Sequence, residues 1–183
     1  MPKVSVIILN WNGKQFLKDC LNAVFNQTYN DFEVVFVDNA SSDGSADFVK
    51  QEFLCEIKSG KLKIVINDRN YGFAEGNNIG VRNSSPDSEY IALLNNDTVV
   101  DPNWLEELVR ILDEDKTVGA VCSLDTGPVG RLEAIDNPVG VLGHTAVYSY
   151  AGLERLTEPF ETLFPGGAAT LYRRALQSSP FDP

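Results

Sequence analysis

The sequence predicts an α/β domain built on a doubly wound, mostly parallel sheet. Short, continuous, β-branched runs alternate with segments whose apolar residues recur at helical spacing. Two of the runs stop abruptly at acids and amides, as strands do at the ligand-binding edge of an open α/β sheet. The chain has 183 residues, of which 43% are hydrophobic and 22% charged, enough for one globular domain with a sizeable core.

The first strand is expected at 4–9, where the residues are apolar and mostly β-branched or leucine. Apolar residues then recur at helical spacing through 16–25, which predicts an amphipathic helix. A second buried strand is expected at 32–37. The Ser, Asp and Gly residues of 41–45 predict a turn that caps a helix over 48–53.

A third strand is expected at 62–66, and the segment 70–76 leads into a short helix that carries Ile79 and Val81. The fourth strand is expected at 90–94. The next helix should open at Asp101-Pro102, with Asp101 as its N-cap and proline at its first position.

The chain changes character after a fifth expected strand at 118–122. Gly and Pro become frequent, so 123–183 is expected to form loops and short irregular strands over the carboxyl edge of the sheet. The last residues show no closing element, and the chain is expected to stop within its domain.

Charge limits the kinds of partner that the chain can bind, and cysteine content indicates its cellular setting. The net charge of −11 argues against nucleic acid, although a metal ion can still bring in a small anion. The cysteines Cys20, Cys55 and Cys122 are far apart, which favours a reducing, intracellular setting. No signal peptide or bilayer-spanning stretch is visible, while peripheral membrane association and the oligomeric state stay open.

The fourth strand runs directly into Asn95-Asn96-Asp97, the most informative feature of the chain. The Asp97 carboxylate suits Mg²⁺ or Mn²⁺, with water and a diphosphate completing the coordination. Asn95 can hydrogen-bond a ribose hydroxyl. The alternative is a turn that only caps the helix after Asp101.

The second strand ends at Asp38, which can accept hydrogen bonds from a base or a ribose hydroxyl, and Asn39 adds donors. The alternative for the following loop, including Asp43, is a capping role. Further along, Arg69 can pair with phosphate or be a solvated charge. The glycines after it match neither a dinucleotide fingerprint nor a Walker A loop. The single histidine, His144, argues against zinc catalysis.

Several blocks in the same order resemble the family-2 glycosyltransferases, which have the GT-A fold, and within them the rhamnosyltransferase-like branch. The resemblance covers nearly the whole chain. The matching blocks are 4–13, 27–29, 32–45, 70–80, 93–97 and 166–174.

The resemblance divides one GT-A domain, 1–183, into a nucleotide-binding half, 1–122, and an acceptor-side half, 123–183. It implies that Asp38 binds the nucleotide base, uracil or thymine, and that Asn10 contacts the nucleoside. Asp97 should bind the metal and Asn95 the ribose side. In the acceptor-side half, Gly166 and Gly167 should approach the donor sugar or the acceptor.

The implied reaction is inverting, metal-dependent transfer from a UDP- or dTDP-sugar to a glycan or a lipid-linked acceptor hydroxyl. The implied setting is polysaccharide and cell wall biosynthesis, in the cytoplasm or at the inner face of the cell membrane. Inversion by a single displacement needs a general base.

Two departures from the family pattern matter. Asn95 stands where the Asp-x-Asp motif has its first carboxylate, which alters donor or metal handling. The motif with the base is expected beyond Pro183, and Glu158, Glu161 and Asp182 do not match it. The main alternative is therefore a non-catalytic nucleotide-sugar-binding module. A sugar nucleotidyltransferase is less favoured, because no Gly-rich, basic loop follows the first strand.

Overall fold

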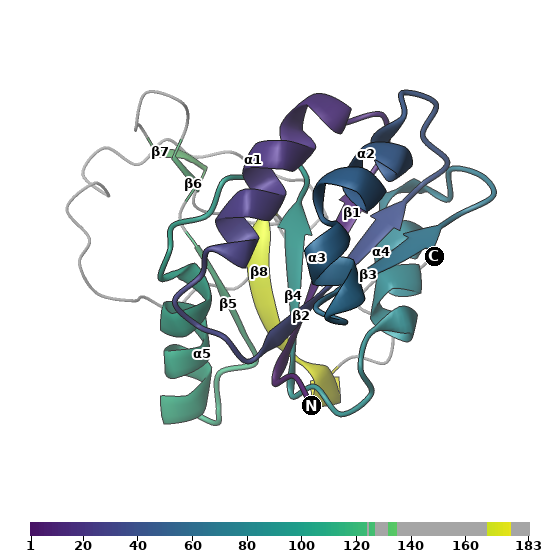
Figure 1. Cartoon of the computed structure of the whole chain (residues 1–183). Coiled ribbons are helices and arrows are strands. Elements are labelled where there is room, and N and C mark those ends of the chain that lie inside the picture. The colour runs from purple at the N-terminus through teal and green to yellow at the C-terminus, as the bar shows by residue number, and fades with distance from the viewer. Residues whose placement is uncertain (124, 127–131, 135–167, 177–183) are drawn as a thin grey trace, which may run out of the picture.

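The computed structural model describes residues 1–123, 125–126, 132–134 and 168–176, and these form a sheet with helices on both faces (Figure 1). The six strands run in the order β3-β2-β1-β4-β8-β5. Neighbouring strands are parallel from β3 to β4, while β8 is antiparallel to both β4 and β5. The expected mostly parallel α/β fold is confirmed.

The strands of the sheet are β1 (Val4–Asn10), β2 (Phe32–Asp38), β3 (Leu62–Ile66), β4 (Tyr90–Asn95), β5 (Ala120–Cys122) and β8 (Ala169–Arg173). A two-stranded ribbon consists of β6 (Asp125–Thr126) and β7 (Leu132–Ala134). The helices are α1 (Lys14–Phe25), α2 (Ser45–Glu52), α3 (Leu54–Lys58), α4 (Gly72–Asn83), α5 (Trp104–Glu114) and the 3₁₀ turn η2 (Arg174–Leu176).

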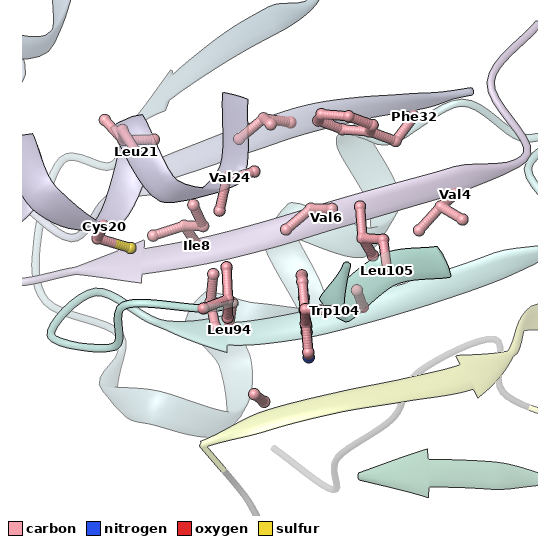
Figure 2. Packing of buried hydrophobic residues seen from close by; sticks show 14 of the residues in the cluster. Val4, Val6, Ile8, Cys20, Leu21, Val24, Phe32, Leu94, Trp104 and Leu105 are labelled. Atoms are coloured by element: carbon pink, nitrogen blue, oxygen red, sulfur yellow. The ribbon is translucent and has the colours of Figure 1, made fainter. Parts of the chain in front are cut away.

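The two faces of the sheet bury separate apolar clusters. Val4, Val6 and Ile8 of β1 point to the face covered by α1 and α5 (Figure 2). Ile7 points to the other face, where Val81 of α4 packs with residues of β2 and β4. Because both faces are covered, the strands are apolar at nearly every position rather than at alternate ones.

Helix α4 lies close to the sheet because two of its residues have no side chain. A Cβ atom on Gly80 would lie 2.3 Å from Cγ2 of Ile7, and one on Gly76 would lie 2.6 Å from Cδ1 of Leu9. The two glycines are one helical turn apart and so face β1 together. Larger residues here would push the helix away from the strand.

The expected cap of α5 is wrong. The helix begins at Trp104, with Asn103 at the N-cap position and no side-chain cap from within its own segment. The Gln27 side chain, which follows α1, caps it instead: Oε1 accepts a hydrogen bond from the Leu105 N–H at 2.9 Å. Its Nε2 donates to the Asp101 carbonyl at 2.7 Å, which holds Asp101 outside the helix.

The expectation that only loops and short irregular strands follow residue 122 is wrong for one segment. Strand β8 lies inside the sheet, between β4 and β5, with Leu94 paired to Ala169 and Tyr90 paired to Arg173. A single short run of apolar residues after a long Gly- and Pro-rich part of the sequence gives no sign of its partner strand, so the sequence pattern could not place it. Most of 123–183 lies outside the described residues.

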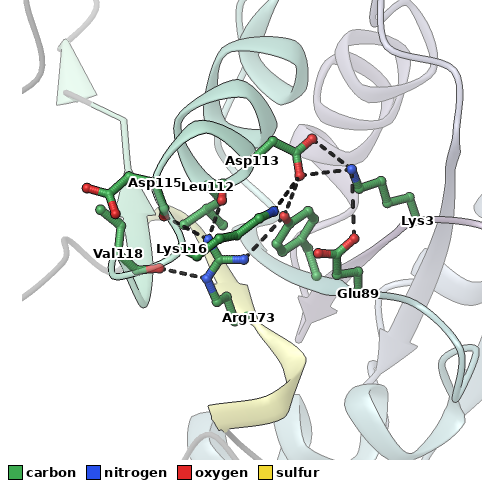
Figure 3. A network of polar contacts seen from close by, with 9 residues as sticks. Lys3, Glu89, Leu112, Asp113, Asp115, Lys116, Val118 and Arg173 are labelled. Atoms are coloured by element: carbon green, nitrogen blue, oxygen red, sulfur yellow. Dashed lines mark hydrogen bonds and ion pairs between the residues drawn. The ribbon is translucent and has the colours of Figure 1, made fainter.

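Two polar networks hold the edge of the sheet where the parallel strands begin. In the first, Asp113 of α5 accepts hydrogen bonds from Lys3 at 2.7 Å and from the Tyr90 hydroxyl at 2.7 Å (Figure 3). Arg173 joins this network by donating from Nε to the Val118 carbonyl at 2.8 Å.

The second network surrounds the turn before β4. Glu33 is buried and accepts hydrogen bonds from Ser5 Oγ at 2.8 Å and from the Ser85 N–H, and Lys63 pairs with it at 2.8 Å. Arg174 donates to the Ser85 carbonyl at 2.8 Å from the other side of the turn. None of the helices in the described ranges is long and apolar enough to cross a membrane.

Candidate functional site

The candidate site lies where the winding direction of the sheet reverses. From β1 the chain moves outward through β2 to β3 and then crosses back by α4 to β4, which pairs with the other side of β1. The crevice at the carboxyl ends of β1 and β4 is thus a topological switch point, where open α/β sheets bind ligands. Asn10, Asp38 and Asn95 are the last residues of β1, β2 and β4.

Asp38 is buried, and two neighbours fix its carboxylate. Oδ1 accepts a hydrogen bond from Asn10 Nδ2 at 3.1 Å, and Oδ2 accepts one from the Ser41 N–H at 3.0 Å. Each carboxylate oxygen has a second lone pair, so both can accept a further hydrogen bond from a ligand. The structure therefore brings together Asn10 and Asp38, two residues that the sequence nominated separately.

The loops after β1 and β2 are bound to each other. Asn12 accepts a hydrogen bond from the Ser42 N–H at 2.8 Å and donates its own N–H to Ser41 Oγ at 2.9 Å. Asn12 and Ala40 both have positive φ, 53° and 61°. That conformation is unfavourable for an alanine, so the surrounding bonds hold Ala40 in it.

The expected capping role of Asp43 is confirmed, and it extends to two helices. Its Oδ1 accepts the Ser45 N–H at the start of α2 at 3.0 Å, and Oδ2 accepts the Lys14 N–H at the start of α1 at 2.9 Å. Burial would raise the pKa of Asp43, but hydrogen bonds from the Ser45 hydroxyl and from the Lys14 and Ser45 N–H groups outweigh it and lower the pKa. Asp43 therefore positions the two loops rather than a ligand.

Asn39 is buried and binds the loop between β3 and α4. Its Oδ1 accepts hydrogen bonds from Asn67 at 2.9 Å and from the Tyr71 N–H at 3.1 Å. Its Nδ2 donates to Asn70 at 2.8 Å and to the Gly72 carbonyl at 3.1 Å. All four hydrogen-bonding positions of the amide are thus filled from within the chain.

Arg69 lies in the loop that Asn39 holds, next to β3 and therefore three strands away from β4. It is exposed, and its guanidinium stands over the Tyr71 ring at 4.7 Å from the centroid. Tyr71 is itself fixed by a hydrogen bond from its hydroxyl to Asp68 at 2.9 Å. The structure places Arg69 on the Asp38 side of the edge, away from Asp97.

Asp97 is exposed, and its side chain makes no hydrogen bond or ion pair to the described part of the chain, so its oxygens are available to a ligand. The strand end before it is firmly held. The Asn95 N–H donates to the Ala168 carbonyl at 2.9 Å, and the Asn95 carbonyl accepts from Thr98 N–H and from the buried Cys20 thiol. Burial, with a smaller contribution from the Asp97 charge, raises the pKa of Cys20 to about 12, so the thiol stays protonated.

Sequence reasoning gave Asn96, the middle residue of the triplet, no role of its own. Its Nδ2 donates to Asn10 Oδ1 at 2.7 Å, which links the end of β4 to the end of β1. Only the strand order brings these residues together, so no local sequence signal could have identified the contact.

Sequence reasoning also missed Trp11, although its position was informative. Trp11 directly follows β1 between two asparagines and is 58% exposed. A large aromatic side chain exposed at a strand end, beside polar groups, is suited to stacking against a planar ligand.

Gly166 and Gly167 lie outside the described residues. Ala168, which follows them, is described, and its carbonyl accepts the hydrogen bond from Asn95. The chain therefore enters β8 at the same edge of the sheet as the candidate site.

The glycosyl transferase family 2 model matches residues 5–178, almost the whole chain, including every strand of the sheet. The chain belongs to this family. The resemblance inferred from the motif blocks is thereby confirmed at the level of the family.

Curated relatives carry the same description. The chain is 34% identical over 123 residues to an uncharacterized glycosyltransferase of Nostoc sp., covering 67% of this chain and 37% of that protein. It is 36% identical over 114 residues to the glycosyltransferase AglE of Haloferax volcanii, covering 61% of this chain and 36% of that protein. The chain thus spans little more than a third of the length of these relatives.

Solved structures share the fold. A mannosyltransferase from Pyrobaculum calidifontis, in complex with GDP-Man and Mn²⁺, superposes with a TM-score of 0.72 at 23% identity, over 96% of this chain and 45% of that one. S. aureus TarS 1–349 in complex with UDP-GlcNAc gives a TM-score of 0.60 at 21% identity, over 69% and 35%. These likenesses support the GT-A fold of this family-2 chain.

Proposed function

We propose that this chain forms the donor-binding part of a metal-dependent, inverting glycosyltransferase of the rhamnosyltransferase-like branch. The observation that carries the proposal is the pair of strand-end carboxylates, Asp38 and Asp97, at the switch point of the sheet. Strands β2 and β4 are two positions apart, so the ends of these two strands stand roughly 10 Å apart along the edge. That span matches a nucleoside diphosphate with its base at one end and its phosphates at the other.

The base is assigned to Asp38. Its carboxylate can accept the ring N–H of uracil or thymine, while Asn10 keeps it oriented. The exposed ring of Trp11 offers a stacking surface for the same base. Arg69 and Asn39 are assigned to the same side, Arg69 as a contact of the nucleotide and Asn39 as the residue that holds its loop. A UDP- or dTDP-sugar is the donor that this arrangement favours.

The diphosphate and a divalent cation are assigned to Asp97, with Asn95 beside the ribose. A free carboxylate, with amide oxygens next to it in the chain, fits Mg²⁺ or Mn²⁺, which keep several waters and take further ligands from phosphates. When bound, the ion offsets negative charge on the departing diphosphate. The described residues hold no group of three or more His, Cys, Asp or Glu that could bind a metal alone, so the cation should depend on the diphosphate.

The acceptor side is assigned to the segment that leads into β8, with Gly166 and Gly167 facing the donor sugar or the acceptor. A glycan or lipid-linked hydroxyl is the proposed acceptor, in polysaccharide or cell wall synthesis at the cytoplasmic face of the membrane. The base that inversion requires is proposed to lie outside this chain. A non-catalytic nucleotide-sugar-binding module would share the donor site and differ only in showing no transfer.

Calorimetric titration of the chain with UDP, dTDP and GDP, each with and without Mn²⁺, tests the proposal. We expect UDP or dTDP to bind in the presence of Mn²⁺, and Mn²⁺ alone to give no measurable heat. Absence of metal-dependent binding for all three nucleotides would contradict the proposal.

Two substitutions separate the roles within the β4 triplet. Asp97→Ala should abolish the effect of Mn²⁺ on UDP binding, because it removes the carboxylate ligand. Asn95→Ala should weaken UDP binding about tenfold, the effect of one hydrogen bond, and keep the Mn²⁺ dependence. Equal losses in the two variants would show that the metal and ribose roles are misassigned.

A further inference from the structure

We infer that Asn96 is a positioning residue that couples the metal end of the site to its base end through Asn10. The inference rests on the proposed function and deepens it. Asn96 is the middle residue of the triplet and is assigned no ligand of its own. Its side chain instead points across the sheet, where it joins the end of β4 to the ends of β1 and β2.

The connection consists of two consecutive hydrogen bonds. Asn96 Nδ2 donates to Asn10 Oδ1 at 2.7 Å, and Asn10 Nδ2 donates to Asp38 Oδ1 at 3.1 Å. Asn10 is buried and Asn96 is half-buried, so water competes little for these bonds. We call Asn96, Asn10 and Asp38 the amide relay.

The direction of the amide relay is fixed by the carboxylate. Ionised Asp38 can only accept hydrogen bonds, so the Asn10 amide must turn its NH₂ toward it. The Asn10 oxygen then faces β4 and needs a donor, which only the NH₂ of Asn96 supplies among the contacts of the described chain. The side-chain oxygen of Asn96 then faces away from Asn10. Asn96 directly precedes Asp97 in the chain. Asn10 Nδ2 also donates to Ser41 Oγ at 3.1 Å, a second acceptor that favours the same orientation of both amides.

Asn96 and Asn10 can meet because Gly13 has no side chain. A Cβ atom on Gly13 would lie 2.2 Å from Asn96 Nδ2 and 2.7 Å from Asn10 Oδ1, the two atoms that form the first bond. The backbone of the loop after β1 thus closes directly over this bond. A Cβ atom at position 13 would therefore force Asn96 and Asn10 apart, and the three atoms nearest to it belong to these two residues and not to Asp38 or Asp97.

This geometry predicts that binding at the Asp97 end of the site and binding at the Asp38 end strengthen each other. A diphosphate and cation at Asp97 order the turn that carries Asn96, and a base at Asp38 orders Asn10. Since the two asparagines bind each other, ordering either end reduces the conformational entropy that the other ligand must remove. Coupling between sites typically changes affinity by about 5- to 150-fold.

The coupling can be measured with the two ends of the donor as separate ligands. Uridine is titrated by NMR into the chain with and without saturating Mn²⁺ and pyrophosphate, and the ratio of its two dissociation constants is the coupling factor. We expect a factor of at least about five in the wild type. In Asn96→Ala and in Gly13→Ala the factor should fall to about one. Asn22→Ala, an exposed asparagine on α1, is the matched control and should keep the wild-type value.

Asn96→Asp tests the direction of the relay with a side chain of the same shape. Its carboxylate can only accept hydrogen bonds and so cannot donate to Asn10 Oδ1, and the coupling factor should fall to about one, as in Asn96→Ala. A wild type that binds UDP with Mn²⁺ but shows a coupling factor of one would overturn the inference and leave the proposed function standing. A wild type that binds no nucleoside diphosphate would overturn the proposed function.

Discussion

At the scale of single residues, hydrogen bonding separates the polar side chains that build the site from those left for a ligand. The side chains of Asn39 and Asp43 form their hydrogen bonds with neighbouring loops and helices. Asp38 keeps part of its accepting capacity, and the Asp97 side chain makes no hydrogen bond or ion pair to the described part of the chain. Mutation of Asn39 or Asp43 is expected to affect folding, and mutation of Asp38 or Asp97 is expected to affect ligand binding.

Asp38→Asn is expected to weaken UDP binding in the presence of Mn²⁺ by about 10- to 100-fold. The variant loses the charged acceptor for the base, and its amide has one oxygen left for the Asn10 NH₂ and the Ser41 N–H, which Asp38 accepts on separate oxygens. Calorimetry measures the loss. Asp19→Asn, which removes an exposed aspartate of α1, should bind UDP like the wild type. Equal affinity in Asp38→Asn and wild type would remove Asp38 from the base site.

The sequence alone identified Asp38 and Asp97, because each follows a buried strand and local pattern suffices to find a strand end. It could not pair Asn96 with Asn10. That contact depends on β4 lying beside β1, and strand order is a property of the whole fold. Trp11 carried a local signal, since a large aromatic between two asparagines at a strand end is unusual.

At the scale of elements, the helix starts show how tertiary contacts replace local capping. The local pattern favoured Asp101 as the cap of α5. In the structure Gln27 supplies the acceptor from a position 78 residues earlier in the chain. The same amide donates to the Ala23 carbonyl at 3.1 Å, so it joins the end of α1 to the start of α5.

Gln27→Ala is expected to lower the free energy of unfolding by about 1–2 kcal/mol. It removes the cap of α5 and leaves the Leu105 N–H and the Asp101 carbonyl without this partner. Urea denaturation at pH 7 measures the change. Gln51→Ala, at an exposed position in α2, is the matched control and should lie within about 0.5 kcal/mol of the wild type. Similar values for both variants would argue against the capping role.

Most strands and helices up to residue 122 were predictable because each has its own hydrophobic period and its own turn residues. The exception is α3, since the one helix expected over 48–53 ends at Glu52 and a second short helix follows Phe53. Strand β8 was not predictable, because its five residues follow a long Gly- and Pro-rich part of the sequence and its partners lie far back in the chain. The start of α5 was misplaced by two residues for a related reason, since Gln27 lies outside any local window.

At the scale of the whole molecule, the two edges of the sheet have different tasks. The carboxyl edge of the parallel strands carries the candidate site. The opposite edge is held by the Asp113 network (Figure 3) and by the Glu33 network, which contribute to stability rather than binding. Burial alone would raise the pKa of Glu33, but hydrogen bonds from Lys63, Ser85 and Ser5 outweigh it and lower the pKa.

Glu33→Gln should therefore change the pH dependence of stability. Because the pKa of Glu33 in the folded chain lies below its unfolded value of about 4.3, its contribution is present above that pH and is lost as pH falls through the folded value. At pH 7 the variant should be less stable by about 1–3 kcal/mol. The difference should shrink in urea titrations at progressively lower pH below about 4.

The control for this prediction is Glu52→Gln, which removes an exposed carboxylate of α2 and should follow the wild-type curve. A stability difference for Glu33→Gln that is the same at pH 7 and pH 3 would show that the ionisation of Glu33 does not stabilise the fold.

The position of β8 also has a consequence for the order in which the chain is made. Arg173 pairs with Tyr90, although 83 residues separate them. A ribosome adding about 5–20 residues per second needs on the order of 4–17 s to cover that distance. During this time β4 exposes the backbone groups that later pair with β8, and an unpaired edge of this kind invites association with other chains. The nascent protein should therefore depend on chaperone protection until β8 has emerged and closed the sheet.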